Sequence, residues 1–160
     1  MRPAPSVQFE TMQPQHLDAV SALDQQARAY PWQRQHFADC LSCGYHAQLL
    51  MNENHVLGYF VVMKGFEEAH LLNMAVAPEH QRQGYARIML NTLTLWADGQ
   101  NAQWLWLEVR ASNTRALNIY TTHGFRCVGS RPGYYPCANG LREDAVVMNL
   151  KLCHPATITP

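Results

Sequence analysis

A strand, a tight turn and a helix follow one another between residues 70 and 99, and this stretch constrains the fold more than any other. Residues 70–76, HLLNMAV, are almost all apolar, a pattern typical of a buried strand. Pro78 has no backbone N–H to donate, so it ends the strand pairing. Beyond it, apolar residues recur at helical spacing, at Ile88, Met89, Leu93 and Trp96. A strand followed directly by such a helix predicts an α/β fold.

The turn between them, QRQGYA at residues 81–86, has the composition of an anion-binding site. Gly84 can adopt backbone conformations that are closed to other residues, and the small Ala86 lets a partner come close. Such a turn leaves N–H groups at the helix start unpaired, where the helix dipole favours negative charge. Arg82 and Arg87 add positive charge. The turn matches neither GxGxxG nor the P-loop pattern, so a glycine turn without a ligand is the alternative.

Length and charge bound the class of protein. We expect one domain at residues 1–150, followed by a flexible tail at 151–160. The 12 basic and 12 acidic residues give a net charge of zero, whereas a duplex-binding surface needs a basic excess. No apolar run approaches the length of a membrane span, and the N-terminus lacks the apolar block of a secretory signal. We therefore expect a cytoplasmic protein with no direct nucleic-acid partner and no membrane partner.

The cysteines and histidines form no strong metal or redox motif. Five cysteines without a secretory signal suit a reducing compartment. Cys40 and Cys43 form a CxxC pair, but no second pair with matching spacing follows it. None of the eight histidines has a partner at the spacing of a helical metal site. We predict no bound metal, and zinc or redox chemistry at Cys40 and Cys43 is the alternative.

The rest of the chain alternates between helices and strands. A strand at 104–109 follows the helix, and a strand–helix–strand order with this spacing implies parallel neighbours joined by a right-handed crossover. The strand at 55–64 is apolar on both faces and should be central in the sheet. The other expected elements are a strand at 7–10, helices at 15–29, from 33 and from 114 to 123, a strand at 47–51 that forms a hairpin with 55–64, and a closing hairpin of 125–131 with 145–150.

Glu108 and Tyr120 are the polar residues that most need an explanation. Glu108 ends a strand whose neighbours should be buried on both faces, and a buried carboxylate is costly unless it is paired or meets water. It either forms an ion pair with Arg110 or Arg87, or serves as a functional carboxylate at the edge of the sheet where ligands gather. Tyr120 shares the packed face of its helix, so it is either a core residue or an acid that opens onto a cleft.

Aromatic residues beside prolines form two further candidate surfaces. Tyr30 and Trp32 flank a proline at a predicted corner, where they could wall a substrate site or simply pack. The long loop of the closing hairpin carries Tyr134 and Tyr135.

Together these segments resemble the GNAT superfamily of acetyl-CoA-dependent N-acetyltransferases. The turn QRQGYA is similar to the superfamily signature R/Q-x-x-G-x-G/A. Within the superfamily, the chain resembles the bacterial enzymes that acetylate the N-terminal alanine of a ribosomal protein. The segments that carry this resemblance over about residues 7–150 are NMAVAPEHQRQGYAR, LWLEVRASN, ALNIY, HGF and REDAVVM, with YPW and YYP. The resemblance implies a mixed, mostly antiparallel central sheet with a parallel splayed pair, flanked by helices on both faces.

The resemblance also implies roles for particular residues. The strand at 70–76 would carry a bulge whose backbone binds the thioester and pantetheine arm, and the turn would hold the pyrophosphate. Glu108 would be the general base, acting through a water, and Tyr120 would protonate the departing thiolate. The implied acetyl-CoA-binding residues are Met74, Ala75, Val76, Arg82, Gln83, Gly84, Tyr85, Ala86, Arg87 and Asn113. Candidates for the groove that binds the acceptor peptide are Tyr30, Trp32, Tyr134 and Tyr135.

The implied reaction is direct attack on acetyl-CoA by the N-terminal amine of a small-subunit ribosomal protein that begins with alanine. An α-amine titrates near ~8 and a lysine near ~10.4, so deprotonation at pH 7 costs about 1.4 and about 4.6 kcal/mol. One carboxylate and a water suffice for the α-amine. The alternatives are acetylation of a lysine, a polyamine or another small amine, transfer through Cys127 or Cys137, and an acyl-CoA-binding module without turnover. We expect a monomer or a weak dimer.

Overall fold

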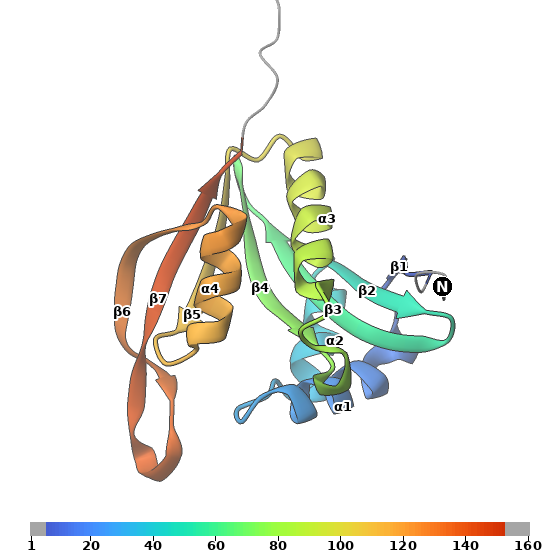
Figure 1. The fold of residues 1–160 in the computed structure, drawn as a ribbon, viewed down its shortest axis with the longest axis horizontal. Helices are drawn as coiled ribbons and strands as arrows, with labels where there is room; N and C mark the ends of the chain where they lie inside the picture. Colours follow the sequence, from blue (N-terminus) through green and yellow to red (C-terminus); the bar gives the residue numbers. More distant parts are fainter. Residues whose placement is uncertain (1–5, 153–160) are drawn as a thin grey trace, which may run out of the picture. The chain divides into compact units, whose positions relative to one another are not determined.

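The computed structural model describes residues 6–152 (Figure 1). These residues divide into two compact units. The first unit takes in the chain up to Met63 together with Leu72–Met89, and the second takes in Lys64–Leu71 together with the chain from Leu90 onward. Strand β4 (Glu68–Val76) and helix α3 (Tyr85–Gly99) therefore contribute to both units. The strands are hydrogen-bonded in the order β1-β2-β3-β4-β5-β7-β6.

The first unit contains the elements that the sequence predicts, with small shifts at their ends. Strands β2 and β3 form the expected hairpin, and β1 pairs with β2, both in antiparallel fashion. The bounds are Gln8–Thr11 for β1, Leu17–Ala27 for α1, Arg34–Ser42 for α2, His46–Asn52 for β2 and His55–Lys64 for β3.

Strand β3 is central, as its two apolar faces predict. Residues 57–62 are all buried. A side chain on Gly58 would meet the Ala75 carbonyl oxygen of β4 at 2.7 Å, so glycine permits the close approach of the two strands. The edge of the Phe37 ring on α2 packs against Tyr59 with the ring centroids 5.3 Å apart, which joins the helices to the sheet.

A fully buried carboxylate, Asp24 on α1, fixes the corner between α1 and α2. It accepts hydrogen bonds from the Tyr59 hydroxyl (2.6 Å) and the Trp32 backbone N–H (2.8 Å), and it pairs with Arg28 (2.6 Å). Burial raises the pKa of Tyr59 well above its ordinary value. The charge of Arg28 opposes this increase in pKa, and Asp24 adds to it. A buried carboxylate is stable only with such partners, so the three donors determine the path of the chain at this corner.

The second unit contains the predicted parallel pair. Residues Glu68–Leu71 of β4 pair in parallel with Trp104–Leu107 of β5, and β7 lies between β5 and β6, antiparallel to both. Asn113 caps helix α4, because its side chain accepts a hydrogen bond from the Ala116 backbone N–H (3.1 Å). The bounds are Trp104–Arg110 for β5, Thr114–His123 for α4, Arg126–Pro136 for β6 and Arg142–Lys151 for β7. The mixed sheet with one parallel pair confirms the predicted α/β fold class.

The structure corrects two details of the second unit. The closing hairpin is longer than predicted, because β6 continues through Tyr134 and Tyr135 instead of ending before them. Strand β5 is fully buried on one face only. Its other face, which includes Trp106 and Glu108, is partly exposed.

The carboxyl-terminal end of the fold lies later than the sequence predicts. Lys151 still belongs to β7, and Leu152 is buried and donates its backbone N–H to the Gln103 carbonyl (2.9 Å). Residues 153–160 of the predicted tail lie outside the described residues. Among the helices that the structure describes, none has the length and hydropathy needed to cross a bilayer.

Candidate active site

The predicted anion-binding turn forms in the first unit with the expected backbone geometry. Gly84 has a φ of +85°, and Arg82 before it has a φ of +62°. Ile88 donates its backbone N–H to the Gly84 carbonyl (3.2 Å), so the N–H groups of residues 85–87 lack partners within the helix. A side chain at Gly84 would meet no atom within 4 Å. The turn is therefore open and presents amide donors where the helix dipole favours an anion.

Side chains bind the carbonyls of β4 in the first unit. The Arg28 guanidinium donates to the Asn73 Oδ1 (2.8 Å) and to the Met74 carbonyl (3.1 Å). The Gln81 side chain donates to the Val76 carbonyl (3.0 Å). These contacts hold the backbone at residues 74–76, and sequence reasoning missed Arg28 because its partner lies 45 residues away.

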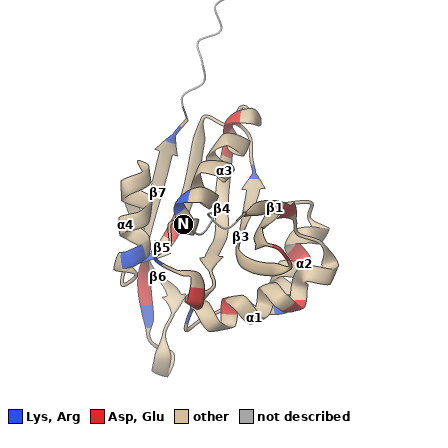
Figure 2. Ribbon diagram, turned by 45° about the vertical axis from the view of Figure 1, so that its right-hand side comes forward, with Lys and Arg blue, Asp and Glu red and all other residues tan. Residues whose placement is uncertain are grey.

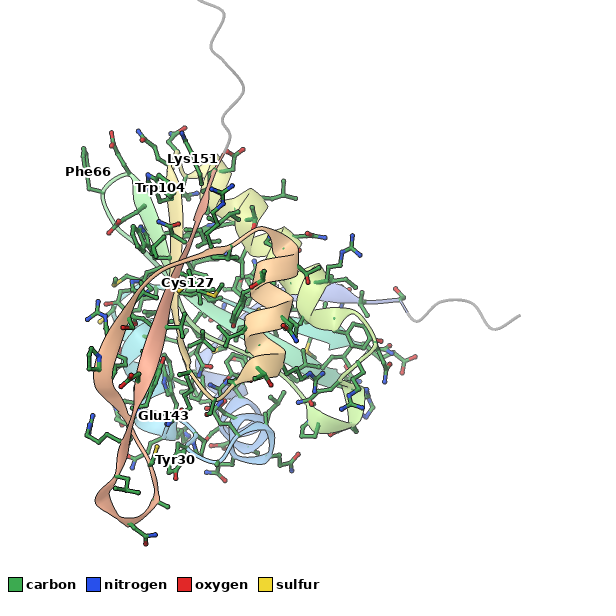
Figure 3. The ribbon with its side chains drawn as sticks, turned by 60° about the vertical axis from the view of Figure 1, so that its left-hand side comes forward. Tyr30, Phe66, Trp104, Cys127, Glu143 and Lys151 are labelled. Atoms are coloured by element: carbon green, nitrogen blue, oxygen red, sulfur yellow. The ribbon has the colours of Figure 1, made fainter. Side chains whose placement is uncertain are left out.

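Tyr30 and Trp32, the two candidate aromatic residues of the first unit, differ in their exposure. Trp32 is partly buried and packs against Phe37 with ring centroids 5.1 Å apart. Tyr30 is 41% exposed and presents its ring at the surface (Figure 3).

In the second unit, Glu108 has two basic neighbours from different strands. Its Oε1 lies 3.2 Å from the Arg131 Nη2 of β6, and its Oε2 lies 3.7 Å from the His70 Nε2 of β4. The side chain is 13% exposed, so its charge needs such compensation. One of the two alternatives for Glu108 was an ion pair with Arg110 or Arg87, and the structure places Arg131 there instead.

Tyr135 lies near this carboxylate and near two further tyrosines. Burial raises the pKa of Tyr135 to about 12, and the nearby charge of Glu108 contributes to the increase, followed by Tyr134, with Arg110 opposing. Tyr120 also contributes to this increase. Tyr120 is buried, and its ring centroid lies 5.7 Å from that of Phe125. The second unit thus brings together Glu108, Tyr120, Tyr134 and Tyr135.

Arg110 organises the hairpin of β6 and β7, a role that the sequence did not reveal. Its guanidinium lies 4.6 Å from the centre of the Tyr135 ring and donates to the Pro136 carbonyl (2.9 Å) and to Glu143 (3.0 Å). Glu143 also accepts from the Ser112 backbone N–H (3.2 Å). Figure 3 shows Glu143 toward the hairpin end of β7. In Figure 2, basic and acidic residues lie next to one another at this end of the hairpin.

Comparison with known proteins places this geometry in a family. The profile of the acetyltransferase (GNAT) family matches residues 11–125. The chain belongs to the GNAT acetyltransferase family.

Two relatives and one solved structure of this family are similar to most of the chain. Ribosomal protein bS18-alanine N-acetyltransferase of Escherichia coli K12 is 36% identical over 136 residues, which are 85% of this chain and 91% of that protein. The enzyme of the same name from Haemophilus ducreyi is 33% identical over 144 residues, 90% of this chain and 99% of that protein. The crystal structure of the E. coli ribosomal-protein-S18-alanine N-acetyltransferase superposes with a TM-score of 0.87 and 32% identity over 97% of this chain and 99% of that one.

Cys40 and Cys43 were the candidates for metal or redox chemistry. Among the described residues, no group of three or more histidine, cysteine, aspartate or glutamate side chains could hold a metal ion. Burial, together with Cys43 and Asp39, raises the pKa of the Cys40 thiol, which makes its thiolate less accessible.

The ion pair of Glu143 predicts a pH-dependent stability. Hydrogen bonds from Arg110 and then Ser112 hold the pKa of Glu143 below its ordinary value of 4.5. The stability gained is therefore present above the ordinary pKa and is lost as pH falls through the folded-state pKa. We expect Glu143→Gln to lower the free energy of unfolding at neutral pH, with the difference from the parent vanishing in acid. Urea unfolding between about pH 7 and about pH 3 measures this difference.

Arg110→Gln provides the matched control, because it removes the other member of the pair. It should show the same dependence on pH, and the double variant should show no further pH-dependent loss. A difference between Glu143→Gln and the parent that stays constant down to the lowest pH would contradict the assignment.

Proposed function

We propose that this protein transfers the acetyl group of acetyl-CoA to the N-terminal α-amine of a protein, namely the N-terminal alanine of a small-subunit ribosomal protein. The observation that carries the proposal is the 36% identity, over 85% of this chain, to a relative named for that reaction. The largely buried carboxylate of Glu108 supplies the chemical group that the reaction needs. Such a substrate implies that the protein works in the cytoplasm.

The open turn of the first unit fits the diphosphate of acetyl-CoA. Its N–H groups at the start of α3 would bind the phosphate oxygens, and Arg82 and Arg87 would add charge. Gln83, Tyr85 and Ala86 complete this turn.

The backbone of β4 would hold the thioester end of the same molecule. The carbonyls of Met74 and Val76 already accept from Arg28 and Gln81, so binding there falls to backbone amides. Asn113 uses its side-chain oxygen as the cap of α4, which leaves its amide nitrogen to donate to the pantetheine arm.

The residues of the second unit would handle the protons. Acetyl-CoA supplies a thioester whose carbonyl carbon forms the new C–N bond while its C–S bond breaks. An α-ammonium group must lose one proton before it can attack, and Glu108 would accept that proton through a water. The nitrogen loses a second proton to solvent once the C–N bond has formed. The Tyr120 hydroxyl would donate a proton to the departing sulfur and recover one from solvent.

The aromatic residues would hold the first residues of the acceptor. Tyr134 and Tyr135 pack edge to face with ring centroids 4.9 Å apart, and Arg110 fixes Tyr135. Tyr30 and Trp32 are the candidates for the acceptor that the first unit offers. One carboxylate suffices for an α-amine near pKa ~8, whereas a lysine needs stronger help, so the α-amine is the better match.

The choice of acceptor is tested with two peptides of the same sequence, which begins with alanine and contains a lysine. The first peptide has a free N-terminus, and the second is N-terminally blocked. We expect acetyl transfer, measured by mass spectrometry with acetyl-CoA, to the free alanine terminus and not to the lysine. A preference for the blocked peptide would reject the proposed acceptor in favour of a lysine or small-amine substrate.

Glu108→Gln tests the base. The substitution keeps the shape of the side chain but removes its capacity to accept a proton, so we expect turnover to fall by about 100- to 10,000-fold. Binding of acetyl-CoA, measured by calorimetry, should be unchanged. Turnover equal to that of the parent from about pH 6 to about pH 9 would remove Glu108 from this role.

Gly84→Ala tests the acetyl-CoA turn. An added Cβ narrows the approach to the amides and strains the positive φ, so we expect the KM for acetyl-CoA to rise by about tenfold. Gly44→Ala is the matched control, because Gly44 also has a positive φ (+75°) and open space around it, but lies just after the C-cap of α2. Equal changes in the KM for acetyl-CoA in the two variants would show that strain alone, and not the site, is responsible.

A further inference from the structure

Two arginines of the second unit meet carboxylates in different ways. Arg110 and Glu143 are each 21% exposed, and Arg110 makes further contacts with the Tyr135 ring and the Pro136 carbonyl. Arg131 is 55% exposed, whereas its partner Glu108 is 13% exposed. Arg110 is therefore held from several sides, while Arg131 reaches a sheltered carboxylate from the solvent side.

Arg131 has a second contact that does not depend on Glu108. Its guanidinium carbon lies 5.4 Å from the centre of the Tyr134 ring, within the range of a cation–π interaction. The register of β6 against β7 is irregular between Arg131 and Tyr135, so Arg131 borders an interrupted part of the ladder. If the ion pair with Glu108 broke, Arg131 would keep the ring and the solvent as partners.

The other oxygen of Glu108 is less tightly engaged. His70 Nε2 lies 3.7 Å from Oε2, which is longer than a hydrogen bond. The contact at 3.2 Å from Arg131 is therefore the closest charged contact to this carboxylate among the ion pairs that the described residues form. Because Arg131 is 55% exposed, a competing cation can reach the carboxylate from the solvent side and replace the arginine without leaving Glu108 uncompensated.

We propose that Arg131 holds the place beside Glu108 that the acceptor's α-ammonium group and its bridging water take, and that a positively charged acceptor displaces it toward Tyr134. The inference rests on the proposed function, in which Glu108 receives a proton from that group. Exchange of one cation for another keeps the sheltered carboxylate compensated throughout. A neutral chain end cannot perform this exchange, so Arg131 acts as a specificity-determining residue that selects a charged amine.

Removal of the competing cation should strengthen binding of the charged acceptor only. We expect Arg131→Gln to lower the KM for the peptide with a free N-terminal alanine by about two- to fivefold with kcat unchanged. The Kd of the same peptide in the presence of CoA should fall by a similar factor. The Kd of a matched peptide that begins with a propionyl group, and so lacks the amine, should not change.

Two further variants separate charge from folding. Arg131→Lys keeps a cation and should return the KM toward the parent value. Arg126→Gln removes an exposed arginine at the start of the same strand and should leave both constants unchanged. Circular dichroism of each variant reports on folding.

The outcomes distinguish this inference from the proposed function. A lower kcat with an unchanged KM in Arg131→Gln would overturn it, because the arginine would then position Glu108 during turnover. An equal fall in the Kd of the free-alanine peptide and of the propionyl peptide would also overturn it, because the charge of the amine would then play no part. If the unmodified enzyme does not acetylate the alanine peptide, the proposed function fails, and the inference fails with it.

Discussion

The carboxylate of Glu108 sets the main constraint on the second unit, because it is largely withheld from water and must keep a compensating charge nearby. The strand that carries it places apolar residues on the opposite face, which fixes the direction in which the carboxylate points. Strands β4 and β6 supply His70 and Arg131, one near each oxygen. Long-range pairing of strands therefore creates the charged surroundings of this group, and no local segment contains them.

Asp24 and Glu108 are both largely buried, and the number and exposure of their partners distinguish a structural carboxylate from one that can take part in chemistry. Asp24 has three donors, including a backbone N–H and a buried hydroxyl, and it determines the path of the chain between two helices. Glu108 has one close cation, which is exposed and has an aromatic ring as a second partner. A carboxylate with fixed donors on all sides holds a fold together, whereas one with an exchangeable cation can take part in binding and proton transfer.

Much of the fold could be predicted because its signals are local. The helical spacing after Gly84 and the hairpin of 47–51 with 55–64 depend on residues a few positions apart, and both are confirmed. The extent of β6 was underestimated, because its glycines and prolines are typical of a loop while its pairing with β7 makes it a strand. The positive φ of Gly84 was predictable because few other residues adopt that conformation readily.

The sequence by itself determined the family, the order of helices and strands, and the composition of the anion-binding turn, since these depend on motif and on spacing along the chain. Only the tertiary structure decided which arginine pairs with Glu108, which one holds Tyr135, and which side chains bind the carbonyls of β4. Several of these partners lie more than twenty residues apart, as Glu108 and Arg131 do. Their meeting depends on strand register and local bulges, which arise from hydrogen bonding across the whole sheet and leave no signal in the neighbouring sequence.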